Sequence, residues 1–455
     1  MPARRWLRTG AALVIIAGCR HVASGDTIPD VRPLERASAG FRGAGSCSAV
    51  ACHGSPTPSP PGQNVLKNEH TTWVTQDKHS SAFQVLFTER SATMAKALGI
   101  PAAHESARCL VCHTTPAPSV ERTAWAGEGV SCESCHGPAD AWLGPHTTAG
   151  WRQLTPHTRE ERFGLIATKD IPRRAELCAT CHVGEPARNG RPARDVNHDL
   201  IAAGHPALRF ELSAYLALMP SHWVEKGPNA AGDFPARAWA VGQVASAKAS
   251  LALLSDRAGR GSWPELAEYS CFSCHRPIDG PGGSSTSPAR SSTPWGTWNH
   301  TFGASVAGID SLGTRADIKP ELDLLKRLME TASPDPKEVS DRARGIADRC
   351  AEWLVATPAA PIDQRTLRAL IVQVRGSPPG DWDGEAQRYL AAIALRQAFA
   401  GLQIDPQGAL PDTAELRRVR RDLQFAAGLD QPRSLRSAQG FGGAGGTAPR
   451  GNGGP

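Results

Sequence analysis

The stretch GVSCESCHGPADAWLGPH, residues 129–146, contains a short motif that recurs along this chain of 455 residues. In CESCH, two cysteines lie three positions apart and a histidine directly follows the second. Counting the CESCH copy, four regular sets and one wider variant occur: Cys109/Cys112/His113, Cys132/Cys135/His136, Cys178/Cys181/His182 and Cys271/Cys274/His275, with Cys47/Cys52/His53 as the variant. Cysteines at positions i and i+3 of a helical turn lie on one face, so their thiols can reach the same ligand.

The repeated order predicts covalent haem c at all five sets. In a CxxCH motif the two thiols bond to the two vinyl groups of one haem, and the adjacent imidazole binds the iron as proximal ligand. Zinc sites would need ligand sets that close with four cysteines, or with two cysteines and two histidines. A redox dithiol gives no reason for a histidine after every copy. We therefore expect five haem c groups.

The first copy, CSAVACH at residues 47–53, is longer than the others because four residues separate its thiols. A wider loop can still bring both sulfurs to the vinyl groups of one haem. The alternative is that Cys47 is a disulfide partner and only Cys52 is attached.

The N-terminus has the pattern of an export signal. Three basic residues come first, Arg4, Arg5 and Arg8. An apolar stretch follows at residues 11–17, and it is too short to span a bilayer. Small residues before Cys19 resemble a bacterial lipobox, so we expect a lipoprotein signal peptide at residues 1–18 and lipidation of Cys19. The alternative is an ordinary secretory signal cut near residues 23–25, which would discard Cys19.

Either signal exports the chain, as haem c attachment outside the cytoplasm requires. Residues 19–46 are mostly polar and contain glycine and proline, so they predict a tether between membrane and domain. We expect a membrane-anchored lipoprotein that faces the periplasm or the cell surface. Arg20, in place of the aspartate associated with inner-membrane retention in some bacteria, is a weak indication of the outer membrane.

The formal net charge of +6 does not indicate a nucleic-acid partner. Arg4, Arg5 and Arg8 leave with the signal, which lowers the charge to +3. Five haems would add ten propionates, enough to make the loaded protein acidic. We therefore expect no nucleic-acid binding.

The composition predicts a mainly α fold in two parts. With 45 glycines and 37 prolines, the chain is loop-rich, and we expect short helices and long loops around the haems in a pentahaem cytochrome c domain at 47–311. Helical spacing over 316–330, 337–356, 363–375, 383–403 and 412–428 predicts a helical C-terminal domain at 312–430. The glycine-rich tail at 431–455 is expected to be disordered.

The sixth position of each iron calls for a second ligand, and ten histidines outside the motifs can supply it. Methionine is scarce, so bis-histidine haems are expected. His79 precedes an apolar helical run, and His146 follows the third motif closely enough for the chain to fold back. His198 and His205 lie seven residues apart, on one face if helical. These four are the histidines that we favour from the residues alone.

Several stretches are similar to the multihaem cytochromes with a cytochrome c-554 and c-prime domain. They are the helix around His79, GVSCESCHGPADAWLGPH, LCATCHVG, NHDLIAAGHPALRFEL, MPSHW and WPELAEYSCFSCH, over about residues 70–276. The resemblance implies His79, His146, His198 and His205 as distal ligands, with His222 as the fifth; His300, His70 and His104 are reserves. Five motifs, one of them CX4CH, and a long helical extension depart from the tetrahaem pattern.

The leading hypothesis is an electron relay through closely packed bis-histidine haems. Its partners would be a redox protein or a quinol-linked membrane donor and an acceptor protein. The first rival is an oxidoreductase with one five-coordinate haem acting on a small nitrogen or sulfur compound. No motif is CxxCK, and Tyr215, Tyr269 and Tyr389 are the only tyrosines that could form a cross-link. The second rival is a docking scaffold, in which the helical domain does the work.

Overall fold

The computed structural model describes residues 40–63, 65–115, 125–188, 190–260, 262–271, 293–376, 381–406 and 408–424. Over these residues the fold is mainly α, as the sequence predicts, and the few β-bridges are isolated pairs. Five features of the sequence analysis lie outside the described residues: the signal at 1–18, Cys19 with the tether as far as residue 39, Cys274, His275 and the tail at 431–455.

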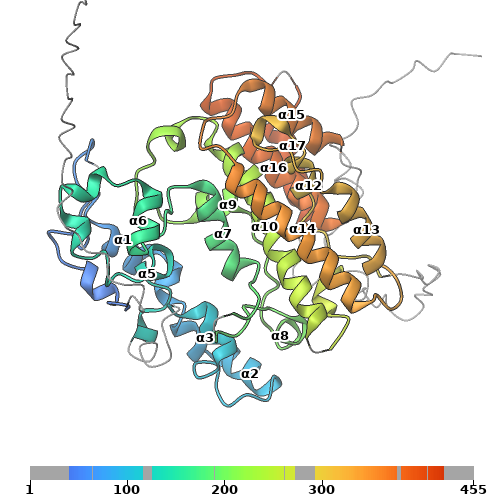
Figure 1. The fold of residues 1–455 in the computed structure, drawn as a ribbon, viewed down its shortest axis with the longest axis horizontal. Coiled ribbons are helices and arrows are strands. Elements are labelled where there is room, and N and C mark those ends of the chain that lie inside the picture. The colour runs from blue at the N-terminus through green and yellow to red at the C-terminus, as the bar shows by residue number, and fades with distance from the viewer. Residues whose placement is uncertain are drawn as a thin grey trace, which may run out of the picture.

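The part that carries the motifs is built from short helices joined by loops. Their bounds are α1 Glu69–Gln76, α2 Glu89–Ala97, α3 Ala107–His113, α5 Cys132–His136, α6 Pro156–Phe163, α7 Ile171–His182, α8 His198–Ala202 and α9 Leu212–Leu218. Single 3-10 turns supplement them, among them Lys78–Ser81 and Gln84–Phe87. Figure 1 shows α1, α5 and α6 together at one side of the molecule, with α2 and α3 below them.

The second part is a bundle of longer helices. Its members are α10 Phe234–Gly259, α12 Gly303–Ala307, α13 Lys319–Met329, α14 Pro336–Ala356, α15 Gln364–Gly376, α16 Trp382–Gly401 and α17 Thr413–Leu423. The last five match the helices that the sequence predicts within a few residues, because apolar residues recur in them at helical spacing, and three of them also have a clear start signal. Asp335, Asp381 and Asp412 supply that signal, each accepting a backbone N–H in the first turn.

The helix α10 was not predicted, because short helices and long loops were expected up to residue 311. It runs for 26 residues and is buried over most of its circumference, so its sequence has no polar stripe to reveal a helical period. Trp239 and Leu254 on this helix are fully buried. It packs along α14 and also against α7, which carries the fourth motif (Figure 1).

One large apolar core therefore crosses the predicted boundary at residues 311/312. The core extends from Ile171 and Ala175 on α7 through α10 to Leu395 and Phe399 on α16. The domain ranges 47–311 and 312–430 remain predictions about the sequence, while the packing joins α7 and α10 to the C-terminal helices.

Close approach of two helices explains one glycine of α10. A Cβ on Gly242 would lie 2.6 Å from the Cβ of Leu212, at the start of α9. The missing side chain thus lets α9 pack directly on α10.

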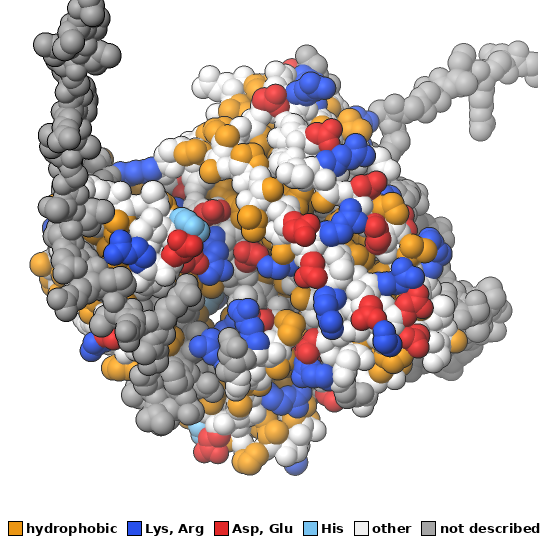
Figure 2. Space-filling view, in the orientation of Figure 1, with side chains coloured by type: hydrophobic (Ala, Val, Ile, Leu, Met, Phe, Trp, Pro, Cys, Tyr) orange, Lys and Arg blue, Asp and Glu red, His pale blue; other side chains and the backbone are white. Residues whose placement is uncertain are grey.

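The surface of the bundle carries charges of both signs. Figure 2 shows acidic and basic side chains interspersed on this face, and several form pairs within one helix, such as Arg342 with Glu338. Within the described residues, no helix has the length and apolarity needed to cross a membrane.

Candidate haem sites

Within the described residues, three of the motifs end an α-helix. The histidine is the last helical residue in each case: His113 in α3, His136 in α5 and His182 in α7. The residue after His136 is Gly137, with φ at +81°, where a Cβ would lie 2.3 Å from the carbonyl oxygen of Gly164. Glycine thus allows the chain to change direction directly after His136.

A carboxylate inside the third motif connects it to the first. Glu133, between the two cysteines of CESCH, is buried, and its oxygens accept the backbone N–H groups of Gly43 at 2.8 Å and Ala139 at 2.6 Å. The N–H of Arg42 lies 3.0 Å from both oxygens. Such charge-assisted bonds are strong, and they fix the segment that leads into Cys47 against α5. The sequence analysis did not identify Glu133; an acidic residue between motif cysteines was the available signal.

The first imidazole pair joins His53 of the first motif to His146. Their ring centroids lie 6.3 Å apart, with 16° between the ring planes. The Nδ1 atom of His53 lies 3.0 Å from the Glu69 carboxylate, which raises the pKa of His53. The Nδ1 atom of His146 lies 2.5 Å from the carbonyl oxygen of Leu143. Both rings therefore keep Nε2 for another partner.

The second pair joins His113 to His205. Their ring centroids lie 6.4 Å apart, with planes at 90°. The Nδ1 atom of His113 is 2.7 Å from the carbonyl oxygen of Ala82, and that of His205 is 2.8 Å from the carbonyl oxygen of Pro206. No described residue is hydrogen-bonded to Nε2 of either ring.

The third pair joins His182 to His79, with ring centroids 5.9 Å apart and planes at 76°. The Nδ1 atom of His79 lies 2.9 Å from the buried carboxylate of Asp77, whose hydrogen bond raises the pKa of His79. His182 is held by aromatic contacts with Phe210 at 5.6 Å and Tyr215 at 5.0 Å. Burial lowers the pKa of His182 to about 4, so the ring is neutral and able to bind a metal.

The spacing of these pairs fits a metal ion between two imidazoles. Two metal–nitrogen bonds of about 2 Å, plus about 1 Å from each nitrogen to its ring centre, place two axial rings about 6 Å apart. Rotation about each bond leaves the angle between the planes unrestricted. Hydrogen bonding of Nδ1 to a carboxylate or carbonyl is the usual outer contact of a metal-binding histidine. Each pair offers two donors, as iron needs when a porphyrin supplies the other four.

No larger donor group competes with this interpretation in the part of the chain that the structure describes. Among those residues, no three side chains of histidine, cysteine, aspartate or glutamate are placed to hold a metal ion. The described motif cysteines, Cys47 included, are free thiols.

The third motif differs from the other α-helical motifs in the surroundings of its histidine, His136. His136 is half-buried, and desolvation lowers its pKa to about 4, with a further contribution from the nearby His222. His222 is also half-buried, and desolvation lowers its pKa in turn. Among the described residues, no imidazole faces His136 at the spacing of the three pairs, so the structure places His222 near His136 without pairing the rings.

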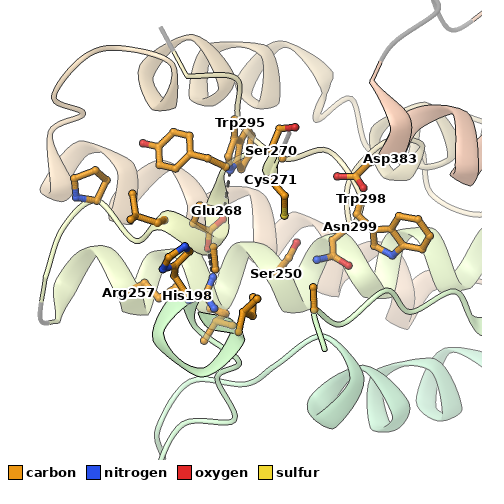
Figure 3. Close-up of a pocket in the computed structure, with 18 of the residues that line it drawn as sticks. His198, Ser250, Arg257, Glu268, Ser270, Cys271, Trp295, Trp298, Asn299 and Asp383 are labelled. Atoms are coloured by element: carbon orange, nitrogen blue, oxygen red, sulfur yellow. Dashed lines mark hydrogen bonds and ion pairs between the residues drawn. The ribbon is translucent and has the colours of Figure 1, made fainter. Parts of the chain in front are cut away.

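The fifth motif is described only at Cys271, which borders a cavity of about 750 Å³. His198 and His300 also line this cavity. In Figure 3 the Cys271 sulfur points into the space between His198 on one side and Asp383 on the other. His300 is buried and stacks on Trp295 at 4.1 Å, and burial lowers its pKa to about 4.

The rings of the two remaining reserves contact aromatic side chains, and the backbone N–H of His70 also donates to the carbonyl oxygen of His53 at 2.9 Å. His70 tilts against Trp73 at 5.6 Å, and His104 stacks on Phe87 at 4.3 Å. Both rings are partly exposed.

Thiols of different motifs meet in two places. The Cys132 thiol donates to Cys47, which lowers the pKa of Cys47 to about 6. In the same way Cys112 lowers the pKa of Cys181 to about 6. The first motif therefore lies beside the third, and the second beside the fourth.

A further contact connects these two groups of motifs. Burial raises the pKa of Cys135 to about 12, and the neighbouring thiols of Cys178 and Cys181 add to that shift. The motifs thus neighbour one another in the spatial order first, third, fourth, second.

Comparison with known proteins gives one match. Residues 47–137, which contain the first three motifs, match the family model described as cytochrome c554 and c-prime. No curated protein and no solved structure matches the chain. The match and the paired imidazoles agree on the chemistry of this region. Residues 47–137 thus carry a cytochrome c554 and c-prime domain, the family that the sequence motifs resemble, and that family is one of c-type cytochromes.

Proposed function

We propose that this protein carries five haem c groups and relays electrons between redox partners at a membrane. When bound, haem iron supplies a centre that takes up and releases one electron. The residues of this chain would attach the haems, hold the irons between imidazoles and keep neighbouring haems close.

The three imidazole pairs carry this proposal. Each contains one motif histidine and one histidine far away in the sequence, and each has the spacing that an iron between two rings requires. In this assignment His146 is the distal ligand of the first haem, His205 of the second and His79 of the fourth.

Two further ligands complete the assignment. His222 lies near His136 and is the proposed distal ligand of the third haem. His198 lines the cavity beside Cys271 and is the proposed distal ligand of the fifth, whose proximal ligand would be His275. An iron with two imidazole ligands has no open position for a substrate, so this arrangement favours electron transfer over catalysis.

The order of the motifs in space supports a relay. Thiols of neighbouring motifs approach within hydrogen-bonding distance at two junctions, so the haem edges bonded to them would be adjacent. Electrons could then pass along the first, third, fourth and second haems without leaving the protein.

The membrane setting comes from the sequence. We propose that the chain is exported and that a lipid on Cys19 anchors it facing the periplasm or the cell surface. Its partners would be a redox protein or quinol-linked donor in the membrane and an acceptor protein.

The test removes one proposed distal ligand. In His146→Ala we expect five attached haems by mass spectrometry, with one iron changed from low spin to high spin in the electron paramagnetic resonance spectrum. The matched control is His157→Ala, since His157 is exposed and ion-paired with Glu161 on α6. An unchanged spectrum in His146→Ala would contradict the ligand assignment, and fewer than five haems in the wild type would contradict the haem count.

The surroundings of His136 favour a second candidate function, an oxidoreductase with one five-coordinate haem at the third motif. This candidate predicts a high-spin signal in the wild type together with turnover of nitrite, hydroxylamine or nitric oxide. His222→Ala separates the two functions. It creates a high-spin iron if His222 is a ligand, and it leaves the spectrum unchanged if the third haem is already open.

A further inference from the structure

The cavity beside Cys271 has the properties of a site for an amphipathic ligand. Its volume of about 750 Å³ lies within the range of about 300–1,000 Å³ of cofactor pockets. The wall includes apolar side chains such as Leu253 and Ile201, and it also includes two arginines, Arg209 and Arg257. A haem would leave its two propionates on the edge of the ring opposite its thioether bonds, so a haem held at Cys271 needs a cation across the cavity.

Arg257 is already paired with two carboxylates of the protein. It donates to Asp195 at 2.5 Å and to Glu268 at 2.6 Å, and its side chain is largely buried. These two carboxylates raise the pKa of Arg257 even though burial opposes them. The Arg257 cluster therefore stabilises the wall and has no charge to offer a ligand.

Arg209 is held in place but lacks a full set of partners. Its guanidinium lies over the rings of Trp382, at 4.8 Å, and Trp298, at 5.7 Å. Trp298 is itself fixed, because its indole N–H donates to the carbonyl oxygen of Phe210 at 3.0 Å. The aromatic faces thus orient the guanidinium plane without using its hydrogen-bond donors.

Only one nitrogen of this guanidinium has a polar contact among the described residues. Nε lies 3.4 Å from Oδ1 of Asp383, while no described residue accepts a hydrogen bond from the two terminal nitrogens. Those terminal nitrogens form the fork that binds a carboxylate with two parallel bonds. Asn299, in the same wall, has a buried Oδ1 without a hydrogen-bond partner. In Figure 3 Asn299, Trp298 and Asp383 lie together on the side away from His198.

A purely structural role would be to neutralise Asp383. That role uses one of the five N–H donors of the guanidinium and leaves the others unexplained. Burial also raises the pKa of Asp383 to about 6, so near neutral pH part of the population is protonated and competes less for the cation.

We propose that Arg209 binds a propionate of the haem attached at Cys271, which makes the α16 helix and its tryptophans part of the site of that haem. The inference rests on the proposed fifth haem. A cation beside a propionate reduces the negative charge near the iron and so favours the reduced state. Arg209 is thus a positioning residue that also raises the potential of one haem.

The test compares Arg209→Gln and Arg209→Lys with the wild type by mass spectrometry and by redox titration followed in the visible spectrum. We expect five haems in every protein and a lower midpoint potential for one haem in Arg209→Gln. A tenfold loss in its reduction equilibrium corresponds to about 59 mV for one electron. Arg209→Lys keeps the charge but not the fork, so its shift should be smaller.

The matched control is Arg349→Gln, which removes a charge from α14, where Arg349 pairs with Glu321 away from the cavity. It should leave all potentials unchanged. Five haems with unchanged potentials in Arg209→Gln would overturn the inference while leaving the proposed function intact. If the wild type lacks the fifth haem, the proposed haem count is wrong, and the Arg209 inference that rests on it falls as well. If Arg209→Gln loses its helical circular dichroism signal, Arg209→Lys becomes the test. Five haems with unchanged midpoint potentials in Arg209→Lys would then overturn the inference.

Discussion

The motif-bearing region and the helical bundle are stabilised in different ways. The bundle has a large apolar core with fully buried tryptophans at 239 and 353. The motif-bearing region before α7 has a small separate cluster around Trp142, Trp151 and Phe163, and otherwise relies on hydrogen bonds such as those of Glu133, whereas α7 belongs to the large core. The bundle resembles an ordinary helical domain, whereas the other region places its paired imidazoles 5.9–6.4 Å apart between ring centroids. We therefore expect bound haems to form much of the core before α7.

The largest expected effect is the loss of structure in the motif-bearing region when haem attachment is prevented. Replacing all motif cysteines with alanine would remove the covalent haems and with them most of the interior between residues 40 and 170, before α7 joins the large core. We expect this region to lose its fixed structure while α10 and α12–α17 keep their helices, because the core of those helices needs no cofactor.

Limited proteolysis with mass mapping and far-ultraviolet circular dichroism measure this outcome. Rapid cleavage should be confined to the first region. Equal protection of both regions in the cysteine-free variant would show that the haems are not structural. Cys350→Ala is the control, because Cys350 is a buried thiol of α14 outside the motifs.

The next prediction concerns the stability of the helical bundle. Trp239→Ala should lower the free energy of unfolding by about 3–5 kcal/mol, since Trp239 is fully buried where α10 meets Phe302. Denaturant titration followed by circular dichroism should show the loss, and the haem count should stay the same. A matching loss of attached haem would mean that the two regions do not fold independently.

The smallest effect concerns the junction of the two regions. Glu211 begins α9, where its oxygens accept the N–H groups of Ser213 and Ala214, both at 2.8 Å. Burial outweighs these bonds and raises the pKa of Glu211 to about 7, from 4.5. The native carboxyl therefore holds its proton more tightly than the unfolded one, and stability falls as the pH rises from about 4.5 to 7.

Glu211→Gln should remove that part of the pH dependence. The change across the window is at most about 3 kcal/mol, because one pKa unit corresponds to about 1.4 kcal/mol. Unfolding titrations at pH 5, 6, 7 and 8 give the difference between variant and wild type. The variant should gain relative stability with rising pH, and a difference that is constant with pH would contradict the raised pKa.

Local patterns predicted much of this structure. The five motifs predicted haem attachment, helical spacing predicted α13–α17, and the surroundings of His79, His146 and His205 marked histidines that the structure brings opposite motif histidines. These features could be found because periodicity and ligand spacing are local properties of a chain. The helix α10 was missed because a helix buried on nearly every side has no polar stripe.

The sequence by itself determined that the protein is mainly helical, and it predicts which residues bind haem, since covalent attachment needs neighbouring thiols and an adjacent imidazole. The tertiary structure alone decided which of the other histidines faces which motif histidine, which motifs are neighbours, and that Arg209 and Asp383 meet across 174 residues of chain. Such pairings depend on how loops of very different length close around a shared interior. Loop closure costs little more entropy for a long loop than for a short one, so separation in sequence gives no guide to the partner.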